Sequence, residues 1–151
     1  NYDYFHFKAI IRKNSFVHDD GWLEETNLTT DKSTLNDWKK TQIKLYSGFI
    51  KKWKKSDYRV QKLSETIKFL KNHGRVVLVR MPTSDAIVAI ENSYWRDFNF
   101  QMKSITEENK VQYVDFTSNM SFFPTYDGVH LDKSNGQKLT KAVCDSILKY
   151  K

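Results

Sequence analysis

The feature that most constrains the fold is a short run of consecutive apolar residues near the middle of the chain. Residues 76–79 read Val-Val-Leu-Val between Arg75 and Arg80, and Pro82 follows closely. A strand with one face in water alternates apolar and polar residues, whereas a parallel strand that is covered on both faces is apolar throughout. Proline cannot donate to a sheet, so Pro82 ends the run. The run therefore predicts a buried strand of an α/β sheet over residues 75–81.

The elements around this strand alternate in type. The predicted order is a helix over 35–55, a helix over 58–73, the strand over 75–81, a helix over 94–109, a strand over 111–116 and a helix that begins near Ser134. The helices carry apolar residues three or four positions apart, and Ser134 with Gln137 forms a capping box for the last one. Helices between successive strands are typical of an α/β fold with parallel strands.

Two strands are too few for a sheet of this kind, because parallel strands are normally buried within larger sheets. Either residues 1–33 supply further strands, or further strands lie upstream in a longer protein, and we favour the second. Residues 1–33 have no sustained period and carry turn signals such as His18-Asp19-Asp20-Gly21. We expect an irregular connecting or lid segment there, with a short helix or hairpin, followed by an α/β unit over residues 34–151.

Composition is that of one folded domain. The 151 residues are 39% hydrophobic and 15% aromatic, which excludes a disordered chain. No apolar run approaches the roughly 20 residues that span a bilayer, and the first residues do not resemble a signal peptide. The single cysteine, Cys144, excludes an internal disulfide and a cysteine-based metal cluster, and we expect it to be a small core residue.

The net charge of +7 raises the question of an acidic partner. The densest basic stretch surrounds Trp53 and consists of Lys51, Lys52, Lys54, Lys55 and Arg59. Such a stretch can bind phosphates and stack bases, but it also suits a solvated helix face whose tryptophan points into the core. We favour the helix face and expect no nucleic-acid partner, since no zinc-finger spacing, RNA-binding motif or Gly-rich phosphate loop accompanies the stretch.

The most specific chemical signal lies near the C-terminus, where Asp127 precedes His130 by three residues with Gly128 between them. A serine hydroxyl needs a base to remove its proton, and a neutral imidazole held by a carboxylate is suited to that task. Gly128 supplies the backbone freedom with which the Asp127 carboxylate can fold back to the Nδ1 side of His130. The alternative is a structural Asp–Gly turn in which His130 caps or packs on the last helix.

Residues 58–149 resemble the C-terminal half of the SGNH (GDSL-like) hydrolase superfamily. The matching features are the strands VVLVRMP and VQYVDF in their helical context and the block DGVHLDKSNGQKLT before the final helix. The segment HDDGW also looks like one found in bacterial members. The family's Asp-x-x-His block falls on Asp127 and His130, which implies catalytic roles for both. The resemblance further implies part of a three-layer, flavodoxin-like sandwich with parallel strands.

The departures from the family concern the nucleophile. The chain contains no Gly-Asp-Ser, Gly-x-Ser or Gly-x-Asn-Asp, so the family's catalytic serine, glycine and asparagine have no counterpart here. Ser84 lies next to a predicted strand end, but it follows the wrong strand. Either the nucleophile-bearing half lies upstream, as a missing N-terminal half of the same protein, or the chain is a degenerate relative.

Other candidate residues carry weaker signals. Arg80 ends the first strand, where α/β proteins place ligand-facing groups, and could bind a substrate anion. We prefer an internal pair with a carboxylate such as Asp85, and Asp115 at the end of the second strand presents the same choice. The three other histidines, His6, His18 and His73, show no metal-ligand spacing, and the segment His18-Asp19-Asp20 reads as a solvated turn. We therefore expect no metal and no cofactor.

Two functions remain open. The first is an SGNH-type ester hydrolase or O-acyltransferase that acts on an acylated carbohydrate or a cell-envelope polymer. The second is a non-catalytic binding module on the same scaffold, with a basic face for an acidic polymer or partner. A serine motif upstream of this chain would favour the enzyme. Bacterial relatives with this layout are often envelope-associated, which favours an extracytoplasmic site, but the sequence does not decide the compartment.

Overall fold

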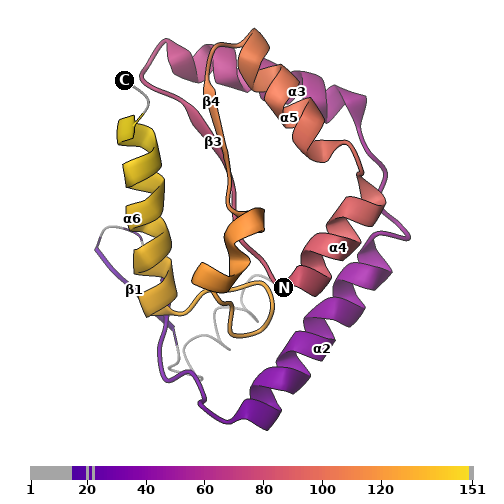
Figure 1. Cartoon of the computed structure of the whole chain (residues 1–151), viewed down its shortest axis with the longest axis vertical. Helices are drawn as coiled ribbons and strands as arrows, with labels where there is room; N and C mark the ends of the chain where they lie inside the picture. Colours follow the sequence, from indigo (N-terminus) through magenta and orange to yellow (C-terminus); the bar gives the residue numbers. More distant parts are fainter. Residues whose placement is uncertain (1–14, 20, 22, 150–151) are drawn as a thin grey trace.

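The protein is a mixed α/β chain with small sheets (Figure 1). A computed structural model describes residues 15–19, 21 and 23–149. In chain order the elements are β1 (Ser15–Val17), β2 (Leu23–Glu25), α2 (Lys32–Phe49), α3 (Asp57–Lys71), β3 (Val77–Arg80), α4 (Asp85–Tyr94), α5 (Phe98–Glu108), β4 (Gln112–Asp115), the 3-10 segment η1 (Thr117–Phe122) and α6 (Lys133–Lys149). No helix in this described part is both long and apolar enough to cross a bilayer.

The strands β3 and β4 pair in parallel, as the sequence predicts. Val77 lies opposite Gln112, and the register continues to Arg80 opposite Asp115. The two strands lie along the middle of the molecule, and the chain between them forms α4 and α5 (Figure 1). A helical crossover of this kind is what a parallel connection requires.

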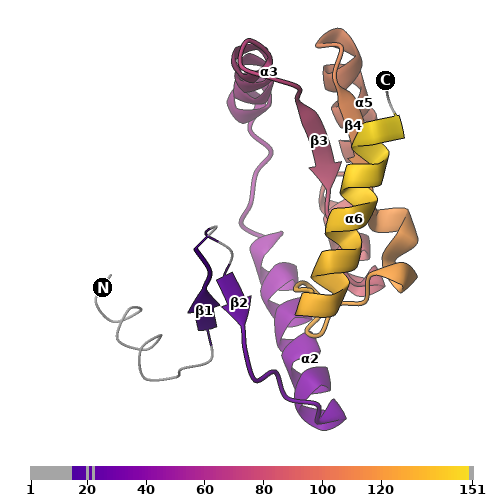
Figure 2. The same cartoon turned by 90° about the vertical axis from the view of Figure 1, so that its left-hand side faces the viewer.

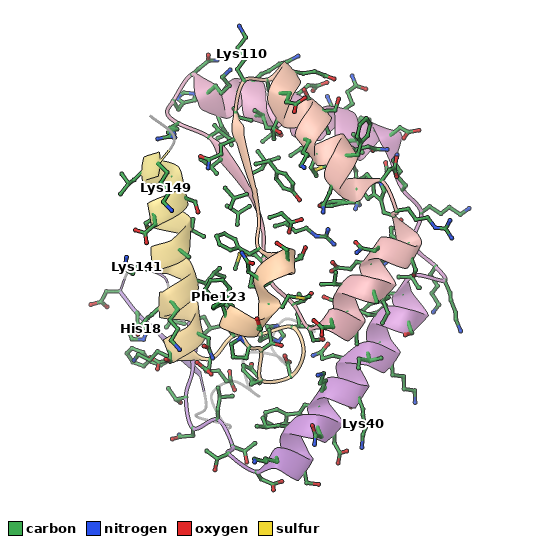
Figure 3. All side chains as sticks on the ribbon, in the orientation of Figure 1. His18, Lys40, Lys110, Phe123, Lys141 and Lys149 are labelled. Carbon is green, nitrogen blue, oxygen red and sulfur yellow. The ribbon has the colours of Figure 1, made fainter. Side chains whose placement is uncertain are left out.

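Helices cover both faces of this pair of strands. On one face, Ile67 of α3 and the buried Met102 and Ile105 of α5 form a cluster with Leu78 and Tyr113. On the other face, Phe116, Phe123 and Leu139 of α6 pack with Val79 and Val114. Figure 2 shows α6 running alongside the strands, and Figure 3 shows Phe123 beside α6. Because neighbouring residues of a strand point to opposite faces, four consecutive apolar residues supply both clusters.

Two helix boundaries differ from those expected, and one helix is additional. Helix α2 ends at Phe49, six residues before Lys55, so the basic stretch lies largely in a turn and a loop. Helix α4 occupies a segment for which no helix was predicted, and α5 begins at Phe98. The break between them is Trp95, whose φ of −134° and ψ of 82° are not helical. Tyr94 therefore ends one helix and does not begin the next.

The last helix begins with a different cap from the predicted one. Oδ1 of Asp132 accepts the backbone N–H of Asn135 at 2.8 Å, and Oδ2 accepts its side-chain amide at 2.8 Å. Aspartate is a strong N-cap residue because its oxygens satisfy the first free N–H groups of a helix. The capping box predicted at Ser134 is thus wrong by two positions, and Asp132 performs that role.

Trp53 and Cys144, which were expected in the core, are exposed, and so are several apolar residues of α2. Helix α2 has no buried residue, and Trp38, Leu45 and Phe49 are all exposed on it. Trp53 is 48% exposed and stacks on Phe49 at 5.2 Å, so its ring does not point into the core. Cys144 is also exposed, whereas Leu139 and Val143 of the same helix pack in the cluster on the strands.

The described part of the N-terminal segment contains the expected hairpin. Strands β1 and β2 pair antiparallel, and Glu24 of β2 contacts Nζ of Lys133 at 3.0 Å, which ties the hairpin to the start of α6. Nε2 of His18 lies 2.8 Å from the same carboxylate. Residues 1–14, with His6 among them, and Asp20 and Trp22 lie outside the described residues.

Candidate functional site

The candidate site is the loop between η1 and α6, and the loop folds back on itself. Thr125 and Leu131 form an antiparallel bridge, and the N–H of Tyr126 donates to the carbonyl of His130 at 2.9 Å. Leu131 packs against the cluster of Phe116, Phe123 and Leu139. Gly128, at the tip, has a φ of +97°, a conformation that other residues rarely adopt.

Asp127 organises this loop with both of its carboxylate oxygens. Oδ1 accepts the backbone N–H of Val129 at 2.9 Å and of His130 at 2.8 Å. Oδ2 lies 2.8 Å from Nδ1 of His130 and accepts Nε2 of Gln42 at 3.3 Å. The side chain of Asp127 is only 8% exposed, so these contacts replace the water that a carboxylate needs.

The same contacts determine the ionisation of Asp127. Burial raises the pKa of this carboxyl group, but the hydrogen bonds from the His130 ring and from the backbone of His130 and Val129 lower it further than burial raises it. The net result is a pKa below the ordinary value of an aspartate. Asp127 is therefore an anion near neutral pH, which favours a proton on Nδ1 of His130.

His130 points away from the core. Its side chain is 59% exposed, and its Nε2 has no hydrogen-bond partner among the described residues. The ring of Tyr126 stacks on the imidazole, with centroids 6.0 Å apart and planes at 25°. A ring that is held by a carboxylate at Nδ1 and is accessible at Nε2 has the arrangement of a general base.

The loop is fixed to the start of α4 through Ser84. The N–H of Ser84 donates to the carbonyl of Gly128 at 2.8 Å. Oγ of Ser84 is buried and has no partner among the described residues, and a Cβ atom added to Gly128 would lie 3.2 Å from it. Because this hydroxyl is enclosed, Ser84 supports the loop and does not present a nucleophile to a substrate.

Arg80 belongs to an internal network. Its guanidinium lies 3.1 Å from Glu91 and donates to Asn99 at 3.0 Å, and its side chain is 9% exposed. Asn99 in turn donates to Asp115 at 2.7 Å. The expectation of an internal pair is confirmed, but the carboxylate is Glu91 of α4 and not Asp85. Arg80 also lines an apolar cavity, so its part in substrate binding stays a prediction.

Two further histidines lie within the described residues and contact groups other than Asp127. His18 contacts Glu24, and the ring of His73 lies 4.9 Å from that of Phe69 at the end of α3. Within the described ranges, no group of three or more His, Cys, Asp or Glu side chains could hold a metal ion.

Sequence reasoning missed two residues of the site. Gln42 contacts Asp127 across 85 positions of sequence, and Trp38 lies edge-on to Tyr126 at 6.2 Å. Both come from α2, whose polar and apolar residues carry no local sign of a distant loop. Their helical spacing of four residues places them on one side of α2, and this is the only signal in the sequence that links them.

Comparisons of the chain with protein-family models, with curated proteins and with solved structures found no match. The functional argument therefore depends on the residues of the site.

Proposed function

We propose that this chain supplies the acid–base part of an SGNH-type ester hydrolase or O-acyltransferase. The proposed substrate is an acylated carbohydrate or cell-envelope polymer. The observation that carries the proposal is the 2.8 Å contact between Oδ2 of Asp127 and Nδ1 of His130, on an imidazole whose other nitrogen is accessible. An imidazole with this pair of neighbours can accept a proton at Nε2 and return it.

The proposed reaction uses His130 twice. Its Nε2 takes the proton of a serine hydroxyl while the oxygen attacks the ester carbonyl, and it then gives this proton to the departing alcohol. Water or a second alcohol next attacks the acyl-serine, gives its proton to Nε2 and releases the acyl product. The proton then returns to the serine oxygen. Asp127 holds the Nδ1–H group and stabilises the imidazolium in both steps.

The serine and the oxyanion donors are proposed to come from an N-terminal half of the same protein. The support is a cavity of about 420 Å³ that is lined by Leu78, Val79 and Arg80 together. Consecutive strand residues point to opposite faces, so a cavity that touches all three runs along the edge of β3. Nε1 of Trp95 and Oγ1 of Thr83, both from residues that line the cavity, are buried without partners among the described residues. An added strand would cover this apolar edge.

A second function is supported by a different observation. Lys51, Lys52, Lys54, Lys55 and Arg59 are all exposed around Trp53. A non-catalytic module could use this surface to bind an acidic polymer, because neighbouring exposed cations attract polyanions. Such a module would bind without any dependence on His130.

The test of the enzyme compares the chain alone with the same chain joined to a serine-bearing N-terminal half. The chain alone should hydrolyse p-nitrophenyl acetate without serine-dependent turnover, because a general base alone supplies only about 10²–10⁴-fold. In the joined protein, His130→Ala should remove turnover and leave the fold intact. Asp127→Asn should reduce it comparably or less.

Two results would contradict the proposal. Rapid turnover by the chain alone that a serine-directed phosphonate abolishes would reveal a nucleophile within it. Full turnover of the joined protein after His130→Ala would show that the dyad is structural.

A further inference from the structure

A second feature of the site is a hollow of about 360 Å³ beside the dyad. Trp38, Thr41 and Gln42 of α2 line it together with Tyr126, His130 and Glu25. Its size falls within the range of small-ligand sites, which is roughly 300–1,000 Å³. Because His130 lines the hollow, a molecule bound there would lie next to the imidazole.

Aromatic rings form one continuous wall of this hollow. Trp38 packs edge-on to Tyr126 at 6.2 Å, and Tyr126 stacks on His130 at 6.0 Å. Trp38 is exposed on a helix that has no buried residue, so its position is not explained by the core. A large aromatic face next to a catalytic-type imidazole offers an apolar surface to one side of a ligand.

The polar groups of the hollow are mainly hydrogen-bond acceptors. Gln42 uses one N–H of its Nε2 to donate to Asp127, which leaves its amide oxygen to accept and its second N–H to donate. The hydroxyl of Thr41 donates to the carbonyl of Asp37 at 2.8 Å, so its lone pairs can accept. Glu25 adds a carboxylate whose charge contributes to the raised pKa of Tyr126, after the larger effect of burial.

This combination selects among ligand chemistries. The described lining contains the acidic residues Glu25 and Asp127 and no lysine or arginine, which disfavours a phosphate or another anion although the chain as a whole carries a net charge of +7. Leu28 is the aliphatic residue of the described lining, which is too little for an acyl chain. A neutral ring with an apolar C–H face and several hydroxyl donors fits both the aromatic wall and the acceptors.

We propose that the hollow lined by Trp38 and Tyr126 binds a neutral pyranose ring, with Trp38 as the platform on which its C–H face packs. The identification of this ring as the sugar part of the ester depends on the proposed function, whereas the binding itself does not. The geometry places the ring's hydroxyl groups near Nε2 of His130, where acyl transfer to or from a hydroxyl would occur.

The test is a titration of the ¹⁵N-labelled chain with methyl β-D-glucopyranoside, followed through the indole N–H signals of its four tryptophans. We expect a saturable shift of the Trp38 signal with a dissociation constant on the order of millimolar, as for a ligand of about a dozen heavy atoms. The signal of Trp53, which does not line the hollow, should stay in place. The 6-phosphate of the same glycoside should bind more weakly.

Matched variants, followed through the backbone amide signals of Tyr126 and His130 because the Trp38 indole is lost, separate the platform from general effects. Trp38→Ala should weaken binding by about tenfold, and Trp38→Phe should restore part of it, since a smaller aromatic face remains. Leu45→Ala removes an exposed apolar side chain from the same helix and should leave binding unchanged.

Three results would overturn the inference. These are the absence of saturable binding by the wild-type chain, equal binding by Trp38→Ala, and equal or tighter binding of the phosphorylated glycoside. The proposed function fails separately. If sugar binding depends on Trp38 but turnover of the joined protein is unchanged by His130→Ala, the sugar subsite is supported. The catalytic role of His130 is then wrong.

Discussion

At the scale of single residues, Asp127 connects the loop to the rest of the molecule. Its two oxygens accept from the backbone of the loop, from the His130 ring and from Gln42 of α2. A buried carboxylate with several donors is stable only as an anion, which is why its pKa lies below the ordinary value despite burial. The charge that orients His130 is thus held in place by the fold.

This lowered pKa predicts how stability depends on pH. A carboxyl group whose folded pKa is depressed stabilises the protein above its unfolded pKa of about 3.9, and this contribution is lost as pH falls through the lower folded value. The unfolding free energy of the Asp127→Asn variant should therefore fall less steeply below about pH 4 than that of the wild type. Urea unfolding between pH 7 and pH 3 measures the difference.

The control for this prediction is Asp145→Asn on α6, where the carboxylate contacts Lys141 and is half exposed. Its acid dependence should match that of wild type. If Asp127→Asn also kept the wild-type slope, the hydrogen bonds of Asp127 would contribute nothing to its ionisation.

The residues of the site were predictable only where the chain itself brings them together. Asp127 and His130 are three positions apart, so a turn suffices to pair them, and their pairing could be predicted. Gln42 reaches the same carboxylate through tertiary packing, which leaves no local pattern. The partner of Arg80 was missed for a similar reason. Helix α4 directs Glu91 back to the guanidinium, while the nearer Asp85 lies in the first turn.

At the scale of elements, the loop 125–131 is held in place by its contacts with the start of α4. Gly128 accepts the N–H of Ser84 through its carbonyl and lies against the side chains of Ser84 and Lys39. Its φ of +97° is set by the turn that returns the chain from Asp127 to His130. A side chain at this position would be both strained and crowded.

Gly128→Ala should therefore lower the unfolding free energy by about 1–3 kcal/mol. Gly48→Ala is the matched control, because Gly48 lies within α2 and a Cβ atom there meets nothing within 4 Å. That change should raise stability by about 0.5–1 kcal/mol, since alanine loses less entropy than glycine in a helix. Chemical denaturation of both variants measures the two effects, and equal values would show that the turn is not constrained.

Helices were predicted well where the buried side chains recur at the regular spacing of one helix face. Helix α3 carries Val60, Leu63 and Ile67 on the side that packs on the strands, and its bounds agree with the prediction within two residues. Helix α2 shows the opposite case. None of its apolar residues is buried, and Trp38, Leu45 and Phe49 are exposed, because the described residues place too little of the chain against them. Periodicity identifies an apolar face without identifying what covers it.

At the scale of the whole molecule, the parallel pair β3–β4 is covered on its faces, and the outer edge of each strand pairs with no other strand among the described residues. The carbonyl of Arg80 accepts the N–H of Phe116, so the backbone groups of Arg80 and Leu78 face β4. Backbone groups of alternate residues point to opposite edges, so those of Val77 and Val79 face the other side. There the cavity along β3 is lined by Trp53, Tyr94 and Trp95. An unpaired edge beside an apolar cavity is a site for an added strand.

Hydrogen exchange distinguishes the two edges of β3 in the chain alone. The amide of Leu78 should be protected by its bond to β4, whereas that of Val79 should exchange faster, because it has no backbone partner among the described residues. Joining the chain to its proposed N-terminal half should slow exchange at Val79 by at least about tenfold and leave Leu78 less affected, since only the former gains a new bond. Equal protection at both positions in the chain alone would mean that the edge is already covered. Unchanged exchange at Val79 in the joined protein would mean that the added half does not pair with β3, and the serine of the proposed reaction would then have to reach Nε2 of His130 from another direction.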